Sequence, residues 1–196
     1  MEANKQEANP FALNLPNQIT ITRLVVSILV FVCIPMGYFI AALVFFLIAA
    51  GTDWADGYIA RKYQLVTKLG RILDPFADKI LICGAFIFLG AEQGSQIAAW
   101  MAVVVVGREL LVTVLRSFME EQGVDFSAQM AGKLKMVFQC VAVVASLALL
   151  ATSADERTDW LLYLTIISVW TAIVSTIYSG AGYIIIAARL LRQPKP

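Results

Sequence analysis

Four aspartates interrupt two segments that are otherwise apolar enough to lie in a membrane. Asp53 and Asp56 are spaced i,i+3, and Asp74 and Asp78 are spaced i,i+4, so each pair occupies one face of a helix. A charged group within a bilayer is costly and normally has a function. Four carboxylates that converge on one recessed site also repel one another and therefore require cations. This cluster is the first candidate for a functional site.

The composition identifies the solvent around most of the chain. Of the 196 residues, 60% are hydrophobic and 15% are charged, whereas about a quarter of a soluble domain is charged. The sequence contains no histidine, which excludes the commonest general base and the commonest zinc ligand. Its three cysteines are isolated in apolar stretches without metal-binding spacing. The composition therefore predicts an integral membrane protein of one domain.

Long apolar stretches joined by short connections predict an all-α bundle of six transmembrane helices. The expected helices cover about Ile19–Met36, Phe39–Tyr63, Gly70–Gly90, Ile97–Glu120, Gln129–Ala151 and Asp159–Leu191. Pro16 and Asn17 precede the first of them as a start signal. Residues 1–15 are expected to form a tail with a short interfacial segment around Phe11–Leu15, or alternatively a disordered extension. Residues 16–196 are expected to form the six-helix domain.

The distribution of basic residues predicts the orientation of the bundle. With six spans, both ends of the chain lie on one side, and 14 of the 15 lysines and arginines lie toward that side, Arg157 being the exception. The positive-inside rule places that side, with the aspartates, in the cytoplasm. Asp53 and Asp78 each lie ~12 Å from the cytoplasmic end of their expected helix. The two pairs are therefore level, which predicts a single site.

The ligand chemistry of the cluster favours hard cations. Carboxylates without histidine or cysteine are typical ligands of Mg²⁺ or Mn²⁺. Two such ions can hold a diphosphate and stabilise the charge that moves in phosphoryl displacement. Gly57, Ala60 and Gly70 leave space for a substrate or another backbone, and Arg61 can pair with a phosphate. The simpler alternative is that the aspartates form structural ion pairs with Arg61, Arg71 or Lys79.

Together these residues resemble the signature of the CDP-alcohol phosphotransferase family. The pattern is Asp56-Gly57-x2-Ala60-Arg61-x8-Gly70-x3-Asp74-x3-Asp78, with Asp53 as an additional upstream aspartate. The resemblance implies a six-helix catalytic domain, usually a homodimer, that holds two divalent ions with the four aspartates. It implies transfer of a phosphatidyl or similar group from a CDP-linked donor to an alcohol, with release of CMP. It makes Asp78 the general base and implies that the nucleotide and diphosphate contact Asp56, Gly57, Ala60, Arg61 and Gly70.

Residues outside this signature resemble one branch of the family, the bacterial phosphatidylglycerophosphate synthases. They are Leu15-Pro-Asn17-x2-Thr20-x2-Arg23, Gly107-Arg108-Glu109, Arg116 and Gly132-Lys133-x-Lys135. The implied reaction joins CDP-diacylglycerol and sn-glycerol 3-phosphate to give phosphatidylglycerol phosphate and CMP in the bacterial inner membrane. The acceptor-phosphate site would then comprise Asn17, Thr20, Arg23, Arg108, Arg116, Lys133 and Lys135. The alternative acceptors are inositol phosphate, serine or phosphatidylglycerol.

The cost of burying charge also predicts a basic wall beside the aspartates, formed by Arg23, Arg108, Arg116, Lys133 and Lys135. Arg108 lies ~18 Å from the cytoplasmic end of its expected helix, and it should face the interior rather than lipid. Positive-inside topology and lipid headgroup contact are the alternative for the basic residues. Glu109 is expected to pair with Arg116, two turns along the same face, and Ser179, Gly180 and Gly182 are expected to pack helices together.

A function of another class, transport of a divalent cation, would also use intramembrane acids. Transporters are expected to have inverted repeats and charges on both faces of the membrane. The sequence shows neither, and its four aspartates lie toward one side. The sequence therefore favours an enzyme over a transporter.

Cysteine labelling in intact cells tests the predicted orientation. In a variant without the three native cysteines, new cysteines at Glu92 and Asp155 should react with an impermeant reagent added outside, because both lie in the expected external connections. Cysteines at Lys62 and Gln122 should react only after the membrane is permeabilised. The reverse labelling pattern would place the aspartates outside the cell and refute the charge argument.

Overall fold

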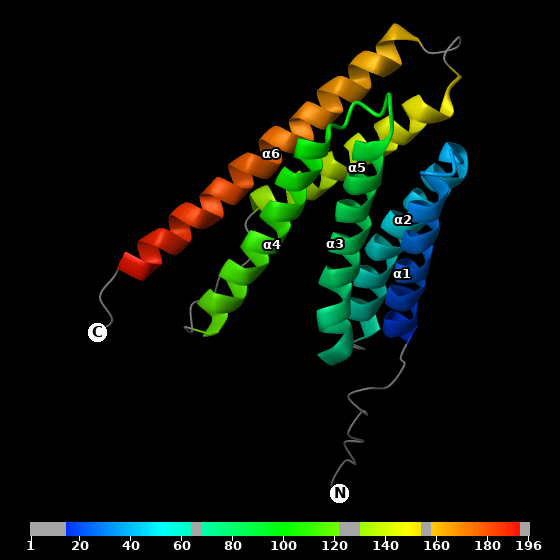
Figure 1. The fold of residues 1–196 in the computed structure, drawn as a ribbon. Coiled ribbons are helices and arrows are strands. Elements are labelled where there is room, and N and C mark those ends of the chain that lie inside the picture. The colour runs from blue at the N-terminus through cyan, green and yellow to red at the C-terminus, as the bar shows by residue number, and fades with distance from the viewer. Residues whose placement is uncertain (1–14, 64–67, 122–129, 154–157, 193–196) are drawn as a thin grey trace, which may run out of the picture.

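The computed structural model describes the backbone of residues 15–63, 68–121, 130–153 and 158–192, and the side chains of 18–52, 75–119, 134–153 and 158–189. These residues form six helices and no strand (Figure 1). The helices are α1 (Leu15–Cys33), α2 (Phe39–Tyr63), α3 (Lys68–Ala91), α4 (Ala99–Glu121), α5 (Met130–Ala151) and α6 (Asp159–Arg192). The all-helical prediction is confirmed, and α2 has the predicted bounds.

The first helix differs from its prediction at both ends. It begins at Leu15, so Pro16 lies within the first turn rather than before it. Proline suits that position because the first turn of a helix leaves its N–H groups unbonded. The helix ends at Cys33 because Gly37 adopts a positive φ of 75°. There Gly37 N donates to Ile34 O and Tyr38 N to Cys33 O, both at 2.9 Å, a glycine-dependent helix stop.

The helices pack as two groups that share α5. On one side α1 contacts both α2 and α3, and on the other α4 and α5 both contact α6. The groups are joined where α5 meets α2 and α3 and where α4 meets α3. In Figure 1 the first residues of α1 and α3 and the last residues of α2, α4 and α6 lie toward the lower end of the bundle. That end carries the aspartate-bearing segments of α2 and α3.

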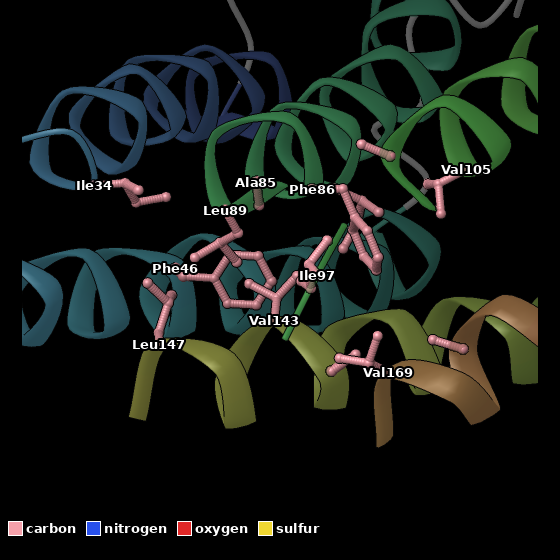
Figure 2. Packing of buried hydrophobic residues seen from close by; sticks show 14 of the residues in the cluster. Ile34, Phe46, Ala85, Phe86, Leu89, Ile97, Val105, Val143, Leu147 and Val169 are labelled. Atoms are coloured by element: carbon pink, nitrogen blue, oxygen red, sulfur yellow. The ribbon is translucent and has the colours of Figure 1, made fainter. Parts of the chain in front are cut away.

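A continuous apolar core fills the opposite half of the bundle. It is built from buried side chains of all six helices, including Val30, Phe46, Phe86, Val105, Val143 and Val169. Figure 2 shows Phe46 of α2, Leu89 of α3 and Val143 of α5 close to one another within this cluster. Because each fully buried side chain of this size contributes about 1.5–3 kcal/mol, this half supplies much of the stability. The other half can therefore accommodate polar groups.

The outer surface of the bundle is apolar. Large side chains such as Ile28, Val103, Ile167 and Tyr178 are exposed on three different helices. Among the described residues, α5 and α6 each contain a stretch long and apolar enough to cross a membrane, and Gln18–Cys33 and Phe39–Thr52 are shorter apolar stretches. An apolar surface of this extent is characteristic of a protein in contact with lipid.

Candidate active site

The polar half of the bundle contains a cavity of about 350 Å³ between α3, α4, α5 and α6. Its described lining is Pro75, Asp78, Lys79, Arg108, Glu109, Val112, Thr113, Arg116, Ser117, Lys135, Met136 and Tyr183. Four of these side chains are basic and two are acidic, so the described lining favours an anionic ligand. The predicted wall residues Arg108, Arg116 and Lys135 thus lie together with Asp78 in one cavity.

Glu109 connects two of these basic side chains. Its Oε1 accepts a hydrogen bond from Arg108 Nη1 at 3.1 Å and another from Lys135 Nζ on α5. The Glu109 side chain is only 9% exposed, so both cations are held by a buried charge-assisted contact. The expected Glu109–Arg116 pair is wrong: seven residues separate them by ~10 Å along α4, whereas Arg108 and Lys135 lie within reach.

Three residues of α6 hold Arg108 from the other side. Ser179 Oγ accepts a hydrogen bond from Arg108 Nη2 at 2.9 Å, and the Tyr183 ring centre lies 5.5 Å from Arg108 Cζ. A Cβ at Gly180 would lie 3.1 Å from Arg108 Cγ, so glycine leaves the space that the arginine stem occupies. Ser179 and Gly180 were expected to pack helices together, and they do so between α4 and α6, where both contact Arg108. The sequence shows their spacing on α6 but not which residue of α4 they meet.

The Asp78 carboxylate is held by α1. Arg23 Nη1 donates to Asp78 Oδ1 at 2.7 Å, and the side chains are 1% and 25% exposed, respectively. Arg23 was expected in the basic wall, but it is not among the described lining residues, because α1 packs against α3 and not beside α4. Thr20, one turn earlier on α1, is also buried outside that lining. Lys79, an expected alternative partner of the aspartates, donates instead to Thr113 Oγ1 at 2.7 Å.

Several predicted site residues lie outside the described side chains. The backbone places Asn17 in α1, Lys133 in α5 and the two segments of the aspartate signature in α2 and α3. The affected residues of that signature are Asp53, Asp56, Gly57, Ala60, Arg61, Gly70 and Asp74. Their assignment to the metal ions, the nucleotide and the diphosphate stays a prediction.

Comparison with known proteins identifies the family of this chain. Residues 13–178 match the CDP-alcohol phosphatidyltransferase family, and the chain belongs to it. A relative from Bacillus subtilis (strain 168) is 37% identical over 87% of this chain and 93% of its own length. Relatives from Rickettsia bellii (strain RML369-C) and Shigella flexneri serotype 5b (strain 8401) are each 34% identical, over 87% and 92% of this chain and 93% and 98% of their own. All three carry the name CDP-diacylglycerol–glycerol-3-phosphate 3-phosphatidyltransferase.

Neutralising Glu109 should destabilise the protein. Glu109→Gln removes the charge that compensates Arg108 and Lys135, which costs about 3–5 kcal/mol when the remaining charges are buried. The melting temperature of purified protein in detergent should fall accordingly. Glu92→Gln, in the connection between α3 and α4, is the matched control and should change stability by less than about 0.5 kcal/mol.

A second substitution separates lost charge compensation from lost packing. Adding Lys135→Met to Glu109→Gln removes one of the two uncompensated cations, so the double variant should be more stable than the sum of the single effects predicts. Strict additivity of the two losses would show that Glu109 does not hold Lys135.

Proposed function

We propose that this protein is a transferase of phospholipid biosynthesis that moves the phosphatidyl group of CDP-diacylglycerol to sn-glycerol 3-phosphate, giving phosphatidylglycerol phosphate and CMP. The observation that carries the proposal is the cavity in which Arg108, Arg116 and Lys135 lie with Asp78. A phosphate on the acceptor needs such a basic wall, whereas a neutral alcohol does not. The names of the relatives support the same acceptor.

Unsatisfied nitrogen atoms support a phosphate ligand for the wall. The buried Nε atoms of Arg108 and Arg116 have no hydrogen-bond partner among the described residues. Buried donors are normally satisfied, and phosphate oxygens of a bound acceptor would do so. In this proposal Arg108, Arg116 and Lys135 bind the acceptor phosphate, with Lys133 and Asn17 as further candidates. Arg23 and Thr20 of α1 lie outside the described lining, so they are proposed to act through Asp78 and not by contact with the phosphate.

The residues of the aspartate cluster fit two divalent cations. The donors are all carboxylates, and Asp78, the one whose side chain is described, is partly exposed and lines the cavity. Asp53, Asp56, Asp74 and Asp78 would hold the ions. When bound, Mg²⁺ or Mn²⁺ supplies positive charge that compensates the diphosphate and the charge developing during displacement.

The remaining chemistry is assigned to side chains and backbone of this chain. Asp78, held by Arg23, accepts the proton of the acceptor hydroxyl as its oxygen attacks the phosphorus that bears diacylglycerol. The bond from that phosphorus to the bridging oxygen breaks, and CMP leaves. Contacts from Asp56, Gly57, Ala60, Arg61 and Gly70 are proposed to orient the nucleotide and the diphosphate.

The membrane setting is part of the proposal. We place six spans in the bacterial inner membrane, with both termini and the cavity on the cytoplasmic side. The apolar outer surface and the excess of lysine and arginine toward one end support this arrangement. A homodimer is proposed from the family resemblance.

Acceptor kinetics test the proposed function. Arg116→Ala should lower kcat/KM for glycerol 3-phosphate about ten- to a hundredfold, since it removes one charge-assisted contact worth about 1.5–3 kcal/mol. Arg108→Ala should act likewise, and both should change the KM for CDP-diacylglycerol much less. Arg61→Ala should show the opposite bias. Arg189→Ala, an exposed arginine of α6 outside the cavity lining, is the control and should resemble wild type.

A panel of alternative acceptors tests whether glycerol 3-phosphate is the preferred acceptor. CMP release from CDP-diacylglycerol would be followed with glycerol 3-phosphate, glycerol, inositol 1-phosphate, serine and phosphatidylglycerol. Glycerol should be a poor acceptor for wild type and equally poor for Arg108→Ala. If another acceptor reacts as well as glycerol 3-phosphate, or if both arginine variants keep wild-type kinetics, the acceptor assignment is wrong.

Metal dependence provides an independent test of the aspartates. Asp→Asn substitution at any of the four positions should reduce turnover severely while the protein still purifies as a folded species, because each removes one ligand charge. EDTA should abolish activity, and Mg²⁺ or Mn²⁺ should restore it. Full activity in the chelator would refute the two-metal proposal.

A further inference from the structure

A smaller cavity, here called the extension, shares Asp78, Lys79, Glu109, Lys135 and Met136 with the lining of the first. This extension has a volume of about 40 Å³ and is lined by Asp78, Lys79, Ile82, Glu109, Lys135, Met136 and Gln139. Ile82 and Gln139 lie four residues beyond Asp78 and Lys135, one turn deeper on α3 and α5. They form the deeper end of the extension, its floor. One water molecule needs about 10–15 Å³ by this kind of measure, so the extension has room for a hydroxyl group.

Gln139 is the neutral polar residue of this floor, and its amide is oriented. The side chain is buried, and its Nε2 donates to Thr176 Oγ1 of α6 at 2.9 Å. Thr176 Oγ1 gives its single proton to Ala172 O at 2.6 Å, so it can only accept from Gln139. The Gln139 amide nitrogen must therefore face Thr176. Its Oε1 has no hydrogen-bond partner among the described residues, which leaves that oxygen for a ligand in the extension.

An acceptor oxygen at this place matches one feature of the proposed acceptor. Glycerol 3-phosphate carries a phosphate, a primary hydroxyl that reacts and a secondary hydroxyl that does not. With the phosphate on the basic wall and the reacting hydroxyl at Asp78, the secondary hydroxyl would lie between them, beside Asp78 and Lys135, which also line the extension. It needs a partner there, because burial of an unpaired hydroxyl is costly.

We propose that Gln139 binds the non-reacting secondary hydroxyl of the acceptor and is a specificity-determining residue for polyol phosphates. The inference rests on the proposed function. A site built around a hydrogen bond to a hydroxyl discriminates against an analogue without it, since the protein group is then left unpaired. Gln139 therefore distinguishes glycerol 3-phosphate from an alkanol phosphate of equal length.

An acceptor that lacks only the secondary hydroxyl tests this role. Wild type should prefer glycerol 3-phosphate over 3-hydroxypropyl phosphate by about tenfold in kcat/KM, the value of one hydrogen bond. Gln139→Met, which keeps length and volume, should reduce the preference to about twofold or less. The loss should fall on glycerol 3-phosphate and leave the analogue nearly unchanged. Thr176→Val, which frees the amide of Gln139, should reduce the preference in the same direction.

A control and the opposing outcomes make the test decisive. Ser146→Ala removes another buried polar contact of α5, a 2.7 Å bond to Ser95 O outside the cavity, and should keep the wild-type preference. If Gln139→Met lowers kcat/KM equally for both substrates, Gln139 only connects α5 to α6, and the inference is refuted. A wild-type enzyme that uses both substrates equally refutes it as well. Failure of the proposed function is distinct, since wild type would then not use glycerol 3-phosphate at all.

Discussion

The buried Glu109 carboxylate is the interaction on which the cavity depends. It lies between α4 and α5 and bonds with Arg108 and Lys135. In a low-dielectric interior two lysine or arginine charges without an acid between them would repel each other and would be costly to desolvate. With Glu109 in place, the cavity lining still carries excess positive charge, because Arg116 and Lys79 also line it. The acid therefore permits a basic cavity without excluding an anionic ligand from it.

The division of the bundle into an apolar and a polar half explains how such a site is tolerated. Side chains of all six helices close one half around Phe46 and Phe86, and this packing holds the helices together without any contribution from the polar groups. Arg23, Arg108 and Lys135 are then held by contacts with other helices rather than by solvent. Rigidly held charges need little reorganisation when a charged substrate binds or reacts.

Local patterns in the sequence were sufficient for the helices and for the family. Runs of apolar residues located all six helices, because hydropathy and helical period depend only on neighbouring positions. The spacing from Asp56 to Asp78 indicated the CDP-alcohol phosphatidyltransferase family, to which residues 13–178 belong. The cost of charge in a membrane indicated that Arg108 faces the interior. The ends of α1 were harder to predict from the sequence, because they depend on the first turn at Pro16 and on the backbone conformation of Gly37.

The sequence by itself thus determined the six helices and the family of this protein, and it predicted which residue types and which helix faces form the site. Only the tertiary structure decided which faces meet. Arg23 reaches Asp78 across 55 positions, and Arg108 reaches Ser179 across 71. Glu109 bonds with Lys135 of another helix and not with the expected Arg116. Such partners depend on the rotation and approach of whole helices, which are set by the summed packing of many side chains and not by any local spacing.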